Sequence, residues 1–176
     1  MTRECAYKDD SCTAIAPCLV PPKAFSMKFI ADVMLGRLAK RMRLLGFDVL
    51  YHRSLNDRDI IMLSLEQDRI ILTRDRALTQ RPLASHHIFI RSETIHDQIT
   101  QVLSLYPLTS CTSALTRCST CNALLAAVKK HEVYDIVPEF VYSNHDVFLR
   151  CPSCCRIYWK GSHLRRMGIS KEGKRN

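Results

Sequence analysis

Two Cys-x-x-Cys pairs are the part of this sequence whose residue types and spacing point most directly to chemistry. Each pair can grip one metal ion from a tight turn, and two pairs supply the four thiolates of a tetrahedral zinc site. Four thiolates leave no open position for water, so this zinc ion would be structural. A single pair can also be a redox motif, but two pairs favour zinc. The four predicted ligands are Cys118, Cys121, Cys151 and Cys154.

Four aspartates form the second candidate group. Asp32 directly follows an apolar run, and Asp75 follows a second run that ends at Thr73. Asp57 and Asp59 lie where a helix would begin. If the apolar runs are parallel strands, their carboxyl ends lie on one edge of the sheet, where such folds bind their ligands. We therefore expect these aspartates to meet in space.

Gathered carboxylates repel one another, and a divalent cation relieves that repulsion. Mg²⁺ and Mn²⁺ prefer oxygen ligands of this type, and such ions can activate water for phosphodiester cleavage. The alternative is that the four aspartates are helix caps and solvated loop residues. Asp48 and Asp68 lie near the opposite ends of the strands, and we assign them no chemistry.

The hydrophobic pattern predicts the elements that must position these side chains. Apolar stretches of strand length alternate with amphipathic stretches of helical period. This alternation predicts an α/β fold with three layers, a parallel sheet with helices on both faces. The sequence has no glycine-rich phosphate loop, which disfavours nucleotide cofactors bound by that device. The predicted strands are 28–31, 47–51, 69–73 and 87–90, and the helices are 34–45, 57–68 and 93–106, with a short turn or helix at 77–78.

The first helix has the clearest two-sided pattern. Its apolar residues recur at steps of three and four, which predicts one buried face. Gly46 is well placed to cap its C-terminus. The predicted buried face consists of Leu35, Leu38, Met42 and Leu45, and the opposite face carries Arg37, Lys40, Arg41 and Arg43.

The net charge of +9 comes from 26 lysines and arginines against 17 aspartates and glutamates. An excess of this size indicates an anionic partner, with nucleic acid the first candidate, or simply contributes to solubility. The excess is uneven, because residues 109–176 hold 11 basic and five acidic side chains. We therefore expect the C-terminal third to contact a polyanion.

Composition changes along the chain predict its division. Three prolines and irregularly spaced cysteines predict that residues 1–26 are a disordered extension, and 109–117 are rich in serine and threonine and predict a linker. The predicted units are the α/β domain 27–108, the cysteine module 118–167 and a basic disordered tail 168–176. Within the cysteine module, 137–142, 146–149 and 157–159 are the predicted strands of a small zinc ribbon.

The sequence predicts an intracellular protein in a reducing compartment, the cytoplasm or the nucleus. Residues 1–26 contain no continuous apolar segment of a secretory signal. No apolar run approaches the 18 residues of a membrane-spanning helix. Cys-x-x-Cys pairs in such a protein are typical of metal sites rather than disulfides.

Basic and aromatic side chains near the second cysteine pair are candidates for RNA contact. Bases can stack on Tyr158 or Trp159 while lysine and arginine bind phosphates. The alternative, which we favour for Trp159, is that the aromatic rings pack the ribbon against the first domain. His163 would bind phosphate or support the active site, and the other predicted contacts are Lys160, Arg165 and Arg166.

Several motifs now carry a resemblance to a known family. The stretches FIAD (29–32), NDRDII (56–61) and RIILTRDRAL (69–78) resemble the PIN-like ribonuclease superfamily. The two cysteine pairs and the stretch YWKGSH (158–163) make the chain similar to the Mut-seven C-terminal RNase domain family. The resemblance covers residues 27 to 167.

This resemblance implies a metal-dependent ribonuclease with an aspartate-based site and a zinc ribbon. Asp32 and Asp75 match the strand-end acids of the family. Asp57 and Asp59 match an acidic D-x-E-type stretch, with aspartate where glutamate is frequent. Related proteins often have a further acid just past the T-R-D motif, whereas residues 76–78 contain none.

The resulting hypothesis is a ribonuclease in which Asp32, Asp75 and one or both of Asp57 and Asp59 hold Mg²⁺ or Mn²⁺. Arg37 and Arg74 are close enough to these acids in sequence to contact phosphate. The alternatives are a non-catalytic RNA-binding module and a zinc-ribbon scaffold that docks protein partners.

Overall fold

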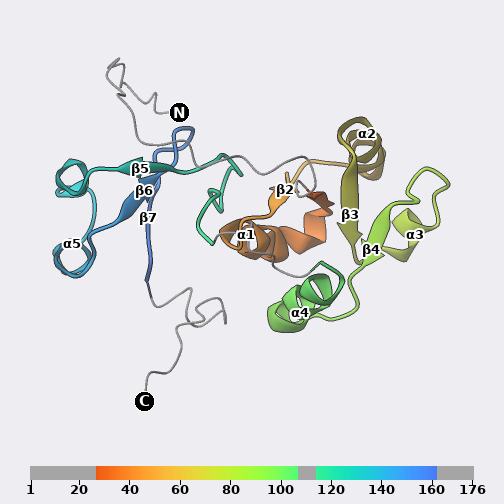
Figure 1. The fold of residues 1–176 in the computed structure, drawn as a ribbon. Coiled ribbons are helices and arrows are strands. Elements are labelled where there is room, and N and C mark those ends of the chain that lie inside the picture. Colours follow the sequence, from red (N-terminus) through yellow and green to blue (C-terminus); the bar gives the residue numbers. More distant parts are fainter. Residues whose placement is uncertain (1–26, 107–113, 162–176) are drawn as a thin grey trace.

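The computed structural model describes residues 27–106 and 114–161. The chain forms a parallel four-stranded sheet and a smaller antiparallel three-stranded sheet (Figure 1). The parallel strands are β1 (Lys28–Ala31), β2 (Asp48–Leu50), β3 (Arg69–Thr73) and β4 (His87–Phe89), in the spatial order β2-β1-β3-β4. The intervening helices are the 3-10 helix Val33–Leu35, α1 (Gly36–Leu44), α2 (Asp57–Gln67), α3 (Arg76–Thr79) and α4 (Ile95–Leu105).

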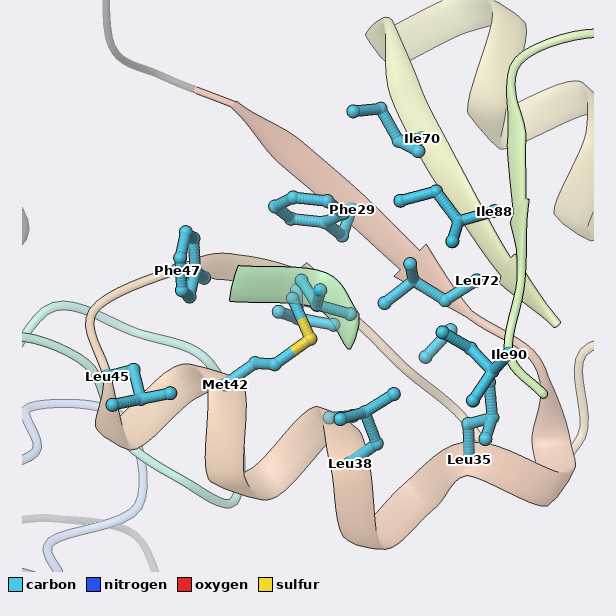
Figure 2. Packing of buried hydrophobic residues seen from close by; sticks show 14 residues of the cluster. Phe29, Leu35, Leu38, Met42, Leu45, Phe47, Ile70, Leu72, Ile88 and Ile90 are labelled. Atoms are coloured by element: carbon cyan, nitrogen blue, oxygen red, sulfur yellow. The ribbon is translucent and has the colours of Figure 1, made fainter. Parts of the chain in front are cut away.

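Helices cover both faces of the parallel sheet, which confirms the predicted α/β fold class. One face packs against α1 and α4, and Figure 2 shows Phe29 of β1 and Leu72 of β3 facing Leu38 and Met42 of α1. The other face packs against α2 and α3 through a second cluster that includes Ile60. Every residue of β3 is buried, as expected of a strand covered on both faces.

The strand register places the ends of β1 and β3 side by side. Ala31 pairs with Leu72, so the next residues, Asp32 and Thr73, lie together at the carboxyl edge of the sheet. The N–H group of Asp32 continues the ladder by donating to the Leu72 carbonyl (2.9 Å). The arrangement of the strands therefore delivers Asp32 to the edge where the sequence predicted it.

Gly36 allows a close approach at this edge. A Cβ atom at position 36 would lie 2.5 Å from the hydroxyl oxygen of Tyr51. With glycine there, the Tyr51 hydroxyl donates a hydrogen bond to the Val33 carbonyl (3.2 Å). This contact ties the segment after β2 to the turn that follows Asp32.

The small sheet has the order β5-β6-β7, with strands β5 (Ala126–Val128), β6 (Phe148–Arg150) and β7 (Ile157–Trp159). A second 3-10 helix (Lys130–Val133) and α5 (Glu139–Asn144) lie between β5 and β6. Val133, Val137 and Phe148 form its core, and Trp159 packs against them. Trp159 therefore packs within the small sheet's own core, not against the parallel sheet as we expected.

The predicted strand at 137–142 is wrong. Pro138 is the N-cap of α5, which covers Glu139–Asn144. Valine, phenylalanine and tyrosine in this stretch suggested a strand because they favour pleated surfaces. Proline at the start of a helix and an acidic first turn are the helix signals that compete with that preference.

Several predictions fall outside the described residues, namely the extension 1–26, part of the linker and the tail 168–176. Where the structure describes the chain, no helix is long and apolar enough to cross a membrane.

Candidate functional site

The two cysteine pairs adopt the same turn. Cys118 accepts a backbone hydrogen bond from Asn122 (3.0 Å) and donates one to the carbonyl group five residues ahead (2.8 Å). Cys151 makes the matching two bonds, each 2.9 Å long. The residue after each pair has a positive φ, 70° at Asn122 and 58° at Cys155. Few non-glycine residues enter this left-handed region, so its use at both pairs marks one repeated turn.

The turns bring four sulfur atoms together. All four lie within 4.8 Å of one another, with 3.5 Å between Cys118 and Cys154 and 3.4 Å between Cys121 and Cys151. Sulfur atoms bound at 2.3 Å to one tetrahedral zinc ion would lie about 3.8 Å apart. The four cysteines thus form a possible metal site whose donor set suits zinc.

Burial and hydrogen bonding give the thiol groups of these cysteines different pKa values. Burial alone raises the pKa of Cys118, but the Tyr158 hydroxyl and the backbone N–H groups of Cys121 and Thr120 lower that pKa to about 6. Burial, and then the neighbouring thiols, raise the pKa of Cys154 to about 12. A second thiolate beside Cys118 therefore needs a cation to offset the repulsion, as a bound metal does.

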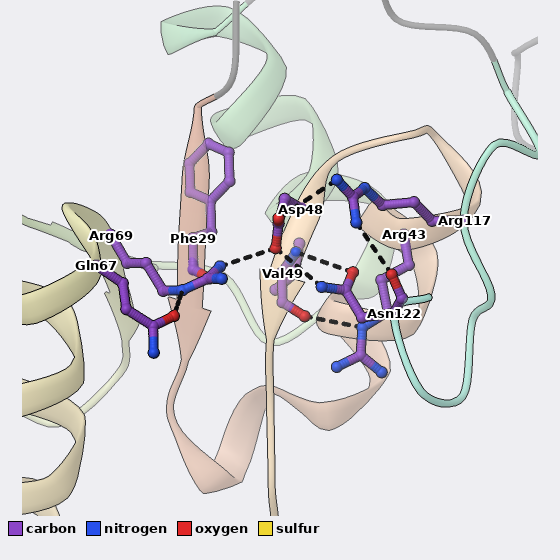
Figure 3. Close-up of polar contacts among 8 residues, drawn as sticks. All are labelled: Phe29, Arg43, Asp48, Val49, Gln67, Arg69, Arg117 and Asn122. Carbon is purple, nitrogen blue, oxygen red and sulfur yellow. Dashed lines mark hydrogen bonds and ion pairs between the residues drawn. The ribbon is translucent and has the colours of Figure 1, made fainter. Parts of the chain in front are cut away.

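The first cysteine turn docks on the edge of the parallel sheet (Figure 3). The Asn122 side chain accepts a hydrogen bond from the Val49 N–H group (3.2 Å) and donates one to Asp48 (2.8 Å). Arg43 of α1 donates to the Val49 carbonyl (2.9 Å) and to two carbonyl groups of the turn. Because β2 is an edge strand, these side chains satisfy backbone groups that would otherwise lack a partner strand.

Asp48 is the charged centre of this contact. It pairs with Arg69 (2.8 Å) and Arg117 (3.3 Å), and its side chain is only 18% exposed. Burial raises the pKa of Asp48, but the hydrogen bonds from Arg69 and Asn122 outweigh it and hold the pKa below its usual value. Asp48 thus joins the cysteine module to the first domain at the amino-terminal edge of the sheet.

Asp32 and Asp75 meet through a shared hydroxyl group at the opposite, carboxyl edge. Thr73 is fully buried, and its Oγ1 donates to Oδ2 of Asp32 (2.7 Å). The same oxygen accepts the N–H group of Asp75 (2.9 Å). Oδ1 of Asp75 caps α3 by accepting the N–H group of Ala77 (2.7 Å). Asp32 is 5% exposed and also caps the turn at Val33.

The other two aspartates lie in the first turn of α2. Asp57 forms an ion pair with Arg81 (2.9 Å). The backbone N–H group of Asp59 donates to the Asn56 side chain, which caps the helix (2.9 Å). Over residues 27–106 and 114–161, the cysteines form a cluster of at least three ligand atoms suited to a metal ion, and these four aspartates do not.

Comparison with known families decides the relationship. A family model described as the Mut7-C RNAse domain matches residues 27–170, which include the parallel sheet, its acid edge and both cysteine pairs. The chain belongs to the Mut7-C RNAse domain family. Membership supports a nuclease-type, RNA-related role. The curated proteins and the solved structures yield no match to the chain.

The predicted RNA contacts are scattered over this Mut7-C RNAse domain. Arg37 is exposed on α1, near the acid edge. Arg74 pairs with Glu93 (2.9 Å), and Lys160 is exposed just after β7. His163, Arg165 and Arg166 lie outside the described residues.

Sequence reasoning missed residues that act through tertiary contacts. Arg43 was placed on the exposed face of the first helix, yet it is 2% exposed. It follows buried Ala39 by four residues, so helical periodicity alone could have put it at the margin of the buried stripe. Tyr158 was considered only as an aromatic ring for stacking or packing. Its hydroxyl oxygen, however, lies 3.1 Å from the sulfur of Cys118.

Proposed function

We propose that this protein is a metal-dependent ribonuclease that hydrolyses RNA phosphodiester bonds at the carboxyl edge of its parallel sheet. The observation that carries the proposal is the pairing of Asp32 and Asp75 through Thr73 in a chain of the Mut7-C RNAse domain family. Two carboxylates at one strand edge are the start of an oxygen ligand set for Mg²⁺ or Mn²⁺. Asp57 and Asp59 would complete it from α2.

Each aspartate would have a distinct part in this site. Asp32 is the most buried of the four, and its orientation is set by Thr73. Asp57 would exchange its Arg81 partner for the metal, leaving Arg81 available to bind the negatively charged substrate. A metal ion held by these aspartates would supply the activation of a water molecule and the stabilisation of the leaving oxygen. Arg37 and Arg74 would contact flanking phosphates.

We propose zinc as the ion of the cysteine centre, with a structural role. The proposed nuclease domain spans 27–108 and the proposed zinc ribbon spans 118–167. In this proposal the ribbon completes the fold and assists RNA binding through Lys160 and the basic residues that follow it. RNA is the proposed partner, because the chain carries a net charge of +9.

The test is RNA cleavage by the purified chain with Mn²⁺ or Mg²⁺. Asp32→Asn and Asp75→Asn each remove a metal-binding charge while keeping the side-chain shape, so cleavage should fall by about 100-fold or more. Asp68→Asn is the matched control, because Asp68 is exposed at the opposite edge and should leave the rate unchanged. Cleavage that survives both edge substitutions, or that persists in EDTA, would rule the proposal out.

A non-catalytic RNA-binding module is the second candidate. Two observations favour it. Asp57 is already paired with Arg81, and the four aspartates do not bring three carboxylate oxygens close enough together to bind one metal ion. Salt-dependent RNA binding without cleavage, over a full series of divalent metals, would select this alternative.

A further inference from the structure

Arg43 connects the parallel sheet to the cysteine centre from within α1. Its guanidinium group is almost completely buried. Nε donates to the Val49 carbonyl (2.9 Å), and Nη1 donates to the carbonyl groups of Ser119 (3.1 Å) and Thr120 (2.8 Å). Both carbonyl groups lie between the two cysteines of the first pair. A buried cation with three carbonyl partners holds the turn in one position relative to β2.

The two carbonyl groups belong to peptide units between Cys118 and Cys121. The Ser119 carbonyl shares its peptide unit with the N–H group of Thr120, and the Thr120 carbonyl shares its unit with the N–H group of Cys121. Arg43 therefore binds the oxygen ends of two peptide dipoles inside the turn that carries both cysteines of the first pair. A cation at the oxygen end polarises a peptide unit and strengthens its N–H group as a donor.

The second cysteine pair provides an internal comparison. The sulfur of Cys151 receives the backbone N–H group of Cys154 (3.4 Å). At the first pair, Arg43 donates to the carbonyl groups of Ser119 and Thr120, the positions that correspond to Pro152 and Ser153 in the second pair. The two turns share their backbone geometry, and Arg43 adds side-chain hydrogen bonds to the carbonyl groups of the first.

We propose that Arg43 is a positioning residue of the metal centre, strengthening the grip of the Cys118–Cys121 turn on the ion. The inference rests on the proposed zinc site and adds to it a residue from the other domain. Residues that orient metal ligands commonly change metal affinity 10- to 100-fold when they are replaced. Arg43 also donates a hydrogen bond to the Val49 carbonyl of β2. Metal binding and the contact between the cysteine turn and β2 therefore stabilise each other.

The test measures zinc affinity of the full chain by competition with a chromophoric chelator, without RNA. Arg43→Met should weaken Zn²⁺ binding roughly 10- to 100-fold and speed metal release. Arg43→Lys should fall between wild type and Arg43→Met, because one ammonium group cannot reach all three carbonyl groups. Arg41→Met, which removes a cation from the same helix, should leave the affinity unchanged.

Asp48→Asn separates a specific effect from loose docking. It weakens the contact between the two domains without touching the carbonyl groups of the turn. If Asp48→Asn lowers zinc affinity as much as Arg43→Met does, or if both Arg43 variants bind zinc like wild type, the inference is overturned. A wild-type chain that takes up no Zn²⁺ would instead overturn the proposed zinc site itself, and neither result bears on RNA cleavage.

Discussion

The cysteine centre and the acid edge are both candidate metal sites, yet they differ in how complete they are. In the cysteine centre, four ligand atoms already lie within 4.8 Å of one another. At the acid edge, Asp32, Asp57 and Asp75 all have hydrogen-bond or ion-pair partners within the protein. The thiols are thus arranged for an ion in advance, whereas the carboxylates must exchange partners to bind one. A structural ion needs the first arrangement, and a catalytic ion that comes with substrate tolerates the second.

The two sites also lie at opposite edges of the parallel sheet. The cysteine turn docks beside Asp48, which pairs with Lys28 at the start of β1, while Asp32 follows the end of that strand. Four residues of strand separate them by about 13 Å. Figure 1 likewise shows the small sheet beside α1 and β2, away from β4. These contacts anchor the cysteine turn at the edge of the sheet opposite Asp32.

The positive charge follows the same division. Residues 114–161 hold six basic and four acidic side chains, so most of the C-terminal excess belongs to 162–176, outside the described residues. Around the acid edge, by contrast, Arg74 directly follows β3, Arg37 is exposed on α1 and Arg81 pairs with Asp57. Within the described residues, the cysteine module therefore carries little of the excess positive charge of the C-terminal third.

The largest expected effect comes from removing one ligand of the cysteine centre. Cys151→Ser leaves three thiolates, and the expected result is loss of bound zinc and of protected structure across 126–159, because structural zinc sites contribute on the order of 10 kcal/mol to folding. Hydrogen exchange followed by mass spectrometry measures this, and the amides of β3 should stay protected.

Ser153→Ala is the control for that experiment, since it alters an exposed side chain in the same turn. Retained zinc and full protection in Cys151→Ser would mean that the cysteines are not a metal centre, which would remove the contrast between the two sites.

A smaller effect is expected at the acid edge from Thr73→Val. The substitution keeps the shape of the side chain but leaves the Asp32 carboxylate and the Asp75 N–H group without their shared partner, so unfolding free energy should fall by about 2 kcal/mol. Urea unfolding measures the loss. Thr73→Ser retains the hydroxyl group and should recover most of it, and an equal loss in both variants would show that packing, not the hydroxyl group, holds the two aspartates.

The smallest effect is expected at Asp48, where the two regions join. Its folded pKa is lowered, so its contribution is present above the unfolded value near 3.9 and is lost as pH falls through the folded value. Asp48→Asn should therefore cost about 1 kcal/mol at pH 7, and the difference from wild type should close below about pH 4. Urea unfolding over pH 3–7 tests this.

Asp146→Asn is the matched control, because Asp146 pairs with Lys130 at the same 2.8 Å but is exposed. If the difference in unfolding free energy between Asp48→Asn and wild type does not vary with pH, the loss comes from the shape of the amide group and not from the missing charge.

The sequence by itself determined the features that depend on local pattern. Periodicity was enough for the alternation of strands and helices. The Cys-x-x-Cys spacing was enough to identify the four cysteines of a possible metal site, because two thiols of one turn are neighbours in any fold. The placement of Asp32 at a strand end followed from the apolar run before it.

The tertiary structure alone decided which distant groups become partners. Thr73 links Asp32 to Asp75 because β1 and β3 are neighbours in the sheet. Arg43 and Asn122 are ordinary surface-type residues in sequence, and they became buried because β2 has a free edge that the cysteine turn covers. Pattern identifies the faces of single elements, but unpaired backbone groups acquire partners only after the elements have packed.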